Sequence, residues 1–163
     1  MSVVDEFLHA NDQYASNFKK GDLPLPPGRK VAVLACMDAR LDPARILGLE
    51  EGDAHVIRNA GGRAADALRS LVISEQLLET NTIVILHHTD CGMLTFTDEV
   101  IHEKIKHDLH ADADHIAFLP FKDLDQSVRD DITFLRTSTL IPESIEIRGF
   151  VYDVKTGKLH SIA

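Results

Sequence analysis

The chain has 163 residues, of which 44% are hydrophobic, and this describes one globular domain long enough to bury a core. Its formal net charge of −9 argues against nucleic acid and anionic membrane as partners, because both repel an acidic surface. We expect no signal peptide and no membrane span, since the sequence shows neither a basic start followed by an apolar block nor an apolar run near the roughly 20 residues that cross a bilayer.

The first segment, residues 2–18, predicts an amphipathic helix. Apolar side chains recur there at a spacing that places them on one stripe: Val4, Phe7, Leu8, Tyr14 and Phe18. The GDLPLPPGRK stretch that follows breaks any helix, because proline lacks an amide donor. Residues 1–20 are therefore a predicted helical arm of a single domain, 1–163. The stripe needs a surface to cover it, and we expect a second copy of the chain.

Four short apolar runs predict strands. They are VAVLAC at 31–36, AHVIRN near 54–59, TIVILHH near 82–88 and SIEIRGFVYDV near 144–154. Helical spacing predicts one helix within 63–79 and another around 124–135. The closing YDVKTGKLHSI predicts a β-hairpin around Thr156 and Gly157. Strands that alternate with helices indicate an α/β fold, with a mostly parallel central sheet flanked by helices and a C-terminal antiparallel hairpin strand.

This architecture predicts where a site would lie. In an open parallel sheet, ligands bind beyond the carboxyl ends of the strands, beside the point where strand order reverses. Cys36 ends the first predicted strand, residues 59–62 follow the second, and His88 to Gly92 follow the third. If the first and third strands are neighbours, a common arrangement in α/β folds, Cys36, His88 and Cys91 meet in one crevice.

Two thiolates and one imidazole form a ligand set that suits zinc and leaves a fourth position free for water. The residues alone leave other interpretations open. Cys36 and Cys91 could be small core residues, with His88 capping a strand. They could also form a redox-active disulfide, which the reducing cytoplasm expected for this chain disfavours, or hold zinc without catalysis. Zinc accounts for all three residues together, whereas a Cys91–His88 nucleophile pair leaves Cys36 unexplained.

Asp38 and Arg40, in CMDAR, stand two residues apart and would face the same side of an extended chain. The arginine would keep the carboxylate ionised and fix its direction through charge-assisted hydrogen bonds. A surface ion pair would have the same pattern. Directly after a candidate metal ligand, however, the pair predicts a carboxylate that accepts a hydrogen bond from metal-bound water and so orients it.

Three other features have mainly structural interpretations. HEKIKHDLHADADH, residues 102–115, predicts a solvated helix that runs into a loop. His87 should point opposite to His88 and satisfy a local hydrogen bond. NAGG, residues 59–62, predicts a turn chosen for backbone freedom. Its position after the second strand also makes Asn59 and Gly61 candidates for substrate binding.

Together, CMDARLDPARILGLEEGDAHVIRNAGG and ILHHTDCGMLTF resemble the beta-class carbonic anhydrases. The paired motifs C-x-D-x-R and H-x-x-C-G lie about fifty residues apart, and GFVYDVKTGKL also fits, so the resemblance spans most of the chain. It implies one zinc ion per chain, held by Cys36, His88 and Cys91. It further implies Asp38 and Arg40 as the catalytic dyad.

By the same resemblance, the amide of Gly92 would face bound bicarbonate. The implied reaction converts CO2 and water to bicarbonate and a proton, with zinc hydroxide as the nucleophile. Related chains with the same ligands hydrolyse carbonyl sulfide or carbon disulfide, which stay alternative substrates. The family's usual unit is a homodimer, often paired into larger assemblies, with the N-terminal arm clasping its partner. The chain has no tryptophan, so the Trp-containing bicarbonate pocket of some members is not expected.

Overall fold

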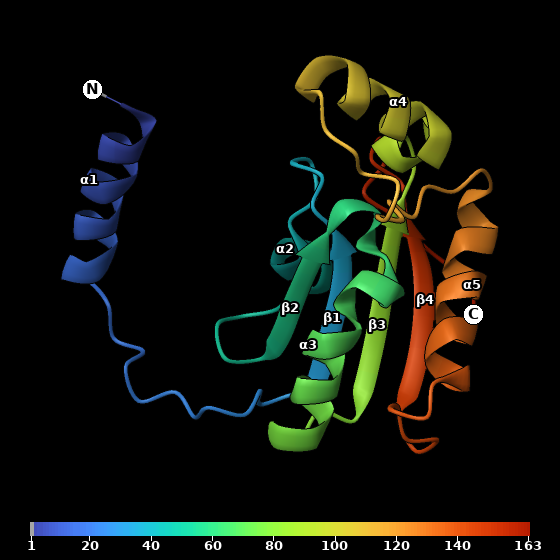
Figure 1. Ribbon diagram of the computed structural model, residues 1–163. Helices are drawn as coiled ribbons and strands as arrows, with labels where there is room; N and C mark the ends of the chain where they lie inside the picture. The colour runs from blue at the N-terminus through green and yellow to red at the C-terminus, as the bar shows by residue number, and fades with distance from the viewer. Residues whose placement is uncertain (1) are drawn as a thin grey trace.

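The computed structural model describes residues 2–163, which fold around one five-stranded sheet (Figure 1). The strands are β1 (Val31–Cys36), β2 (Ala54–Asn59), β3 (Thr82–His88), β4 (Glu146–Tyr152) and β5 (Leu159–Ser161). Their order is β2-β1-β3-β4-β5, in which the first four run parallel and β5 is antiparallel to β4. The predicted α/β class, the pairing of the first and third strands and the C-terminal hairpin are confirmed.

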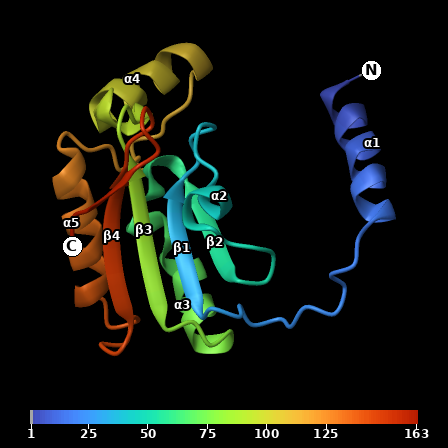
Figure 2. The same cartoon turned by 180° about the vertical axis from the view of Figure 1, so that it is seen from behind.

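The helices lie unevenly around this sheet. They are α1 (Val3–Ser16), α2 (Pro43–Leu47), α3 (Ala64–Leu77), α4 (Asp98–Leu109) and α5 (Leu124–Thr137), with 3-10 turns η1 (Ala60–Gly62) and η2 (Gly92–Leu94). Figure 1 shows α3 and α5 across one face, and Figure 2 shows the opposite face, with α2 beside β1 and β2. The main core lies under α3 and α5, where aliphatic side chains of the helices meet those of β1, β3 and β4.

Strand β1, which lies between β2 and β3, is buried from Ala32 to Cys36, as expected for a parallel strand covered on both faces. After β1 the chain forms α2, a helix that the sequence analysis did not predict. Its signals are local, since Asp42 caps the first turn, Pro43 opens the helix and Gly48 closes it at a φ of 64°. This short helix places residues 37–42 over the carboxyl end of the sheet.

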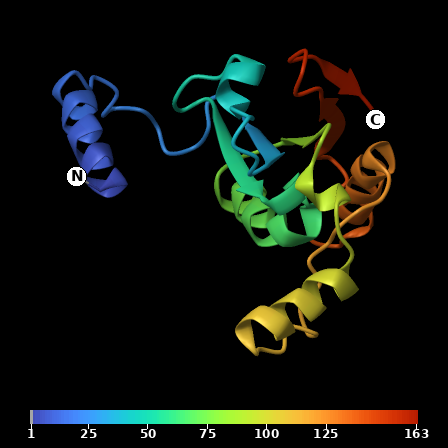
Figure 3. The same cartoon turned by 90° about the horizontal axis from the view of Figure 1, so that it is seen from above.

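The predicted arm is helical, but none of its side chains is buried against the other described residues. In α1, Ser2 and Asp5 form a reciprocal capping box, and no residue of the helix is buried. Phe7, on the apolar stripe, is 66% exposed. The helix stands apart from the sheet in Figures 1 and 3, joined to it by an extended segment.

The histidine-rich segment 102–115 also follows its prediction. Helix α4 has no buried residue and ends at Leu109, where His110 takes a left-handed φ of 52° and the loop begins. Figure 1 shows α4 beyond the carboxyl ends of the strands. Among residues 2–163, no helix combines the length and the apolar character that a membrane crossing requires.

Candidate metal centre

Two cysteines and a histidine meet at the carboxyl end of the sheet. Cys36 is the last residue of β1, His88 is the last residue of β3, and Cys91 directly precedes η2. Because β1 and β3 are adjacent and parallel, their carboxyl ends lie side by side. All three residues are buried, and their ligand atoms lie within 4.8 Å of one another. The structure thus brings together the three ligands predicted from sequence.

The two ring nitrogens of His88 have different surroundings. Nδ1 lies 2.7 Å from the carbonyl oxygen of Thr89, and donating to it leaves the lone pair on Nε2. Nε2 is buried and has no hydrogen-bond partner among the described residues. Leaving such an atom unpaired costs free energy, and a metal ion bound by Nε2 would remove that cost. Two sulfurs and one imidazole nitrogen are donors that fit zinc.

The pKa values of the two thiols are shifted in opposite directions. The hydrogen bond from Cys91 lowers the pKa of Cys36 to about 4, and the amide of Gly61 donates to the same sulfur at 3.3 Å. The contact with Cys36, together with burial, raises the pKa of Cys91. Cys36 is therefore the thiol that ionises first. Cys91 would lose its proton when a bound cation compensates the second negative charge.

The turn after β2 supports this arrangement. Gly61 and Gly62 have φ values of 82° and 63°, in the left-handed region that favours glycine. A Cβ atom on Gly62 would lie 3.0 Å from the backbone nitrogen of Cys36, so this backbone approaches β1 closely. The side chain of Asn59 accepts from the amide of Arg63 at 2.7 Å and donates to its carbonyl at 3.0 Å. The polar groups of Asn59 and Gly61 thus have partners within the protein, and their contact with substrate stays a prediction.

Asp38 and Arg40, the predicted dyad, are hydrogen-bonded to each other, and their catalytic role stays a prediction. Arg40 donates from Nε to Oδ1 of Asp38 at 3.0 Å and from Nη2 to Oδ2 at 2.9 Å. Its backbone amide also donates to Oδ1, at 2.8 Å. The guanidinium holds the pKa of Asp38 far below its usual range, and Asp38 in turn raises the pKa of Arg40. The other carboxylate oxygen, Oδ2, lies 3.7 Å from Nε2 of His88, so the dyad borders the ligand cluster.

Gly92 follows the last ligand and is exposed. Apart from its chain neighbours and the backbone of η2, no atom of the described residues lies within 4 Å of the position that a Cβ would occupy, so there is open space beside it. This leaves room for a ligand near its amide. Contact with bicarbonate stays a prediction.

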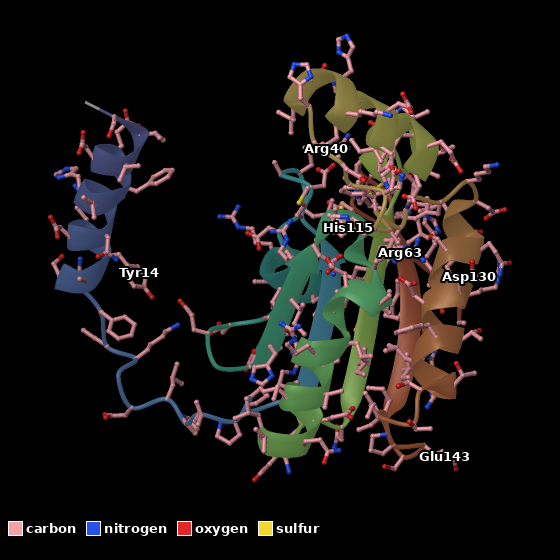
Figure 4. The ribbon with its side chains drawn as sticks, viewed as in Figure 1. Tyr14, Arg40, Arg63, His115, Asp130 and Glu143 are labelled. Atoms are coloured by element: carbon pink, nitrogen blue, oxygen red, sulfur yellow. The ribbon has the colours of Figure 1, made fainter. Side chains whose placement is uncertain are left out.

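One residue of the site was missed by the sequence analysis. Arg40 also donates from Nη1 to the carboxylate of Asp90 at 2.9 Å and from Nη2 to its carbonyl oxygen at 2.9 Å. Figure 4 labels Arg40 at the carboxyl end of the sheet, where these contacts lie. The only sequence signal is the place of Asp90 between the ligands His88 and Cys91.

His87 enters a second polar cluster, separate from the ligands. Its Nδ1 pairs with Oγ of Ser127 at 2.7 Å, and its Nε2 lies 3.1 Å from Oδ2 of Asp131. Arg63, labelled in Figure 4, donates from Nη2 to Asp131 at 2.8 Å, and the amide of Ala64 donates to the same carboxylate at 3.1 Å. The local hydrogen bond predicted for His87 is confirmed, within a network that also ties α3 to α5.

Comparison with known proteins identifies the family of this chain. The family model described as carbonic anhydrase matches residues 31–159, a range that includes the three candidate ligands and the candidate dyad of Asp38 and Arg40. The chain belongs to the beta-carbonic anhydrase family. It is 45% identical to Beta-carbonic anhydrase 1 of Mycobacterium bovis, over 99% of this chain and 99% of the relative. The crystal structure of carbonic anhydrase from Streptococcus mutans matches with a TM-score of 0.95 and 52% identity, over 100% of this chain and 99% of that chain.

A third relative carries a different name. Carbon disulfide hydrolase of Acidianus sp. is 32% identical, over 96% of this chain and 87% of the relative. Beta-carbonic anhydrases use zinc, and the Cys36–His88–Cys91 cluster offers the donors for that metal. The fold, the family and the metal expected from the sequence are therefore confirmed.

Proposed function

We propose that this beta-carbonic anhydrase catalyses the reversible conversion of CO2 and water to bicarbonate and a proton, at one zinc ion per chain held by Cys36, His88 and Cys91. One observation carries the proposal. The buried Nε2 of His88, which has no hydrogen-bond partner within residues 2–163, lies beside the sulfurs of two cysteines, and the Asp38 carboxylate lies 3.7 Å from that nitrogen. A metal-binding pocket and an orienting carboxylate therefore share one location.

The metal and the residues that hold it have separate tasks. Zinc supplies, when bound, the Lewis acidity that makes water a nucleophile near neutral pH. The hydrogen bond to Thr89 fixes the tautomer of His88 and directs Nε2 at the metal position. The amide of Gly61 stabilises negative charge on Cys36. Two thiolates would cancel the charge of a divalent cation, so water at this site should ionise less readily than at a three-histidine site, and activity should rise towards alkaline pH.

Asp38 and Arg40 orient the reacting water. An ionised carboxylate only accepts hydrogen bonds, and Arg40 keeps Asp38 ionised. A proton of the water pointing at Asp38 directs the oxygen lone pair towards CO2, which is how proximity and orientation lower a barrier. Asp38 is mostly shielded, with 18% of its side chain exposed, whereas Arg40 is 46% exposed. The carboxylate thus lies inside the pocket, while the guanidinium closes its outer side.

The surroundings of the ligands suit an apolar gas. Leu41 and Met93 are buried against Cys36 and Cys91, and Phe121 packs on the same cluster. Such a lining excludes bulk water and accepts a small apolar substrate, with few polar groups to fix its orientation. Carbon disulfide is apolar as well, so the lining does not separate the two substrates. The 45% identity to a beta-carbonic anhydrase, against 32% to a carbon disulfide hydrolase, favours CO2.

The test is stopped-flow CO2 hydration on protein whose zinc content has been measured, with carbonyl sulfide and carbon disulfide assayed on the same batch. We expect about one zinc per chain, as three ligands and an open place imply, and rapid CO2 hydration. Cys91→Ser should abolish CO2 hydration and lower the zinc content. Asp108→Asn, which removes an exposed carboxylate paired with Lys104 on α4, should change neither. Zinc-loaded protein that turns over only carbon disulfide would replace the proposal, and zinc without any turnover would indicate a non-catalytic module.

We also propose a homodimer or larger homo-oligomer of this single domain in the cytoplasm. The exposed stripe of α1 supports the assembly, because an apolar helix face without partners in its own chain needs another surface. The free thiols of Cys36 and Cys91 support a reducing compartment. Deleting residues 1–18, or making the paired change Phe7→Glu and Leu8→Glu, should lower the mass seen by light scattering. Gln13→Glu, on the opposite side of α1, should not. A parent protein that is monomeric at working concentrations would refute the assembly.

A further inference from the structure

We propose that Asp90 is a positioning residue for the dyad, which holds Arg40 in place and thereby keeps Asp38 away from the metal. This inference rests on the proposed function, because a zinc ion held by Cys36, His88 and Cys91 is what Asp38 would otherwise bind. Nothing in the sequence motifs requires an acid at this position, so the assignment comes from the contacts of Arg40.

Arg40 is held from two sides. Its Nε and Nη2 donate to the two oxygens of Asp38, at 3.0 and 2.9 Å. Its Nη1 donates to Oδ2 of Asp90, and Nη2 donates to the Asp90 carbonyl, both at 2.9 Å. Four of the five N–H donors of a guanidinium are thus used, in a planar group whose fork fixes geometry as well as energy. Rotation of Arg40 together with Asp38 would break both bonds to Asp90.

Asp38 lies close enough to the metal position to become a ligand. Its Oδ2 lies 3.7 Å from Nε2 of His88, the atom directed at the metal position. A carboxylate is a good zinc ligand, so Asp38 could take the fourth place that water needs. Among the described residues, only Arg40 donates hydrogen bonds to the Asp38 carboxylate. Residues that fix the position of Arg40 therefore determine whether the fourth coordination position of the metal stays open to water.

Asp90 can supply this restraint without contributing much to folding. Its side chain is 78% exposed, and ion pairs in water contribute little to stability. Its backbone lies in the left-handed region, at a φ of 55°, which asparagine and glycine also tolerate. Asp90→Asn therefore keeps the backbone and a neutral acceptor but loses the charge. Asp90→Gly keeps the backbone carbonyl and loses the whole side chain.

Two measurements on purified full-length protein test the inference. They are kcat from stopped-flow CO2 hydration and the zinc dissociation constant from competition with a chromophoric chelator. For Asp90→Asn we expect kcat to fall about twofold, and for Asp90→Gly about fivefold, the range over which an exposed ion pair can bias a geometry. Zinc binding should tighten by similar factors, because Asp38 becomes a fourth ligand. Asp108→Asn, the matched loss of one surface carboxylate, should change neither quantity.

A double-mutant cycle shows whether Asp90 acts through Arg40. In an Arg40→Ala background, Asp90→Gly should change neither kcat nor zinc affinity further, because the contact is already lost. Equal effects in both backgrounds would overturn the proposal. Zinc binding that is unchanged or weaker in Asp90→Gly would also overturn it, since a loop disturbed between two ligands loses metal. A parent that binds zinc but does not hydrate CO2 would contradict the proposed function, while the zinc affinities of the variants would still test the role of Asp90.

Discussion

Two adjacent histidines at the end of β3 have opposite surroundings. His87 is buried with both ring nitrogens paired, to Ser127 and Asp131, in a cluster that Arg63 completes. His88 is equally buried, but its Nε2 has no partner among the described residues and faces two cysteines. Strand geometry turns neighbouring side chains to opposite faces, so one strand serves both purposes. The hydrogen-bonded cluster around His87 therefore contributes to stability, whereas the cluster around His88 is suited to binding a metal.

An unpaired buried atom alone does not identify a site. The carboxylate oxygens of Glu75 also lack partners among residues 2–163, and burial raises the pKa of that carboxyl. Within the described part of the chain, no other ligand-type side chain converges on Glu75 to form a metal-binding group with it. What distinguishes His88 is convergence, since three donors of suitable chemistry surround one point. The comparison therefore predicts which variants lose function and which lose stability.

The largest effect should follow from His88→Ala. Activity should fall about 1,000-fold or more, beyond the 10- to 100-fold typical of residues that only orient a ligand. Zinc content should fall with it, because two thiols remain as ligands. The metal-free variant should also unfold at a lower denaturant concentration than the metal-free parent, because it loses a fully buried side chain and the hydrogen bond from Nδ1 to Thr89. Normal zinc content in this variant would contradict the ligand assignment.

Asp131→Asn should lower the stability of the protein and leave its zinc binding unchanged. The carboxylate is buried and bonds to Arg63, His87 and the amide of Ala64, so its loss leaves a mostly buried guanidinium unpaired. We expect the free energy of unfolding to fall by about 3 kcal/mol, as when one partner of a buried pair is removed. Protein that is still folded should bind zinc normally. Urea unfolding with a zinc measurement on the same sample checks this, and unchanged stability would remove the structural role assigned to the cluster.

The same carboxylate predicts a pH dependence of stability. Burial alone would raise the pKa of Asp131, but His87 and Arg63 together lower it below the ordinary value of 3.8. A depressed pKa in the folded state adds stability above the unfolded value, and that stability is lost as pH falls through the folded pKa. The parent should therefore lose stability below pH 3.8, with a shallower loss in Asp131→Asn. The measurement is the free energy of unfolding in urea at a series of pH values. The same loss of stability below pH 3.8 in both proteins would contradict the assigned pKa shift.

Arg40→Ala should change the rate more than the stability. Without the guanidinium, Asp38 is free to reach the metal position, and kcat should fall about 10- to 100-fold, as when a group that orients a metal ligand or its water is lost. Stability should change by less than about 0.5 kcal/mol, because the pair is partly exposed. Asp38→Asn should likewise keep zinc and lose rate, since an amide cannot replace an ionised acceptor. Either variant with the parent's rate and pH profile would reduce the dyad to a surface ion pair.

The smallest effect is expected for Glu75→Gln. Because the folded pKa of Glu75 lies above its ordinary value of 4.5, the ionised form costs stability once pH exceeds that value. The variant should be more stable at neutral pH, by less than about 1 kcal/mol, since the side chain is only partly buried. Activity and zinc content should not change. A loss of activity or of zinc would show that Glu75 takes part in function, although no cluster of metal ligands surrounds it in the described structure.

The sequence predicted the parts of this molecule that depend on local patterns. The four parallel strands, α3 and α5 followed from apolar spacing, and the ligands followed from donor chemistry at strand ends. Helix α2 was missed because five residues are too few for a periodic pattern, although Asp42, Pro43 and Gly48 signal its ends. Asp90 and the partners of His87 could not be predicted. The contacts of Asp90 with Arg40 and of His87 with Ser127 and Asp131 join residues 40 to 50 positions apart, and only the folded chain brings them together.

The most direct test of the metal centre is zinc K-edge X-ray absorption on the purified parent protein. The account predicts two sulfur neighbours at about 2.3 Å and nitrogen or oxygen neighbours at about 2.0–2.1 Å, from His88 and a fourth ligand. Cys91→Ser, if it retains any zinc, should show one sulfur neighbour. A zinc environment of nitrogen and oxygen alone in the parent would contradict the assignment of Cys36 and Cys91 as ligands.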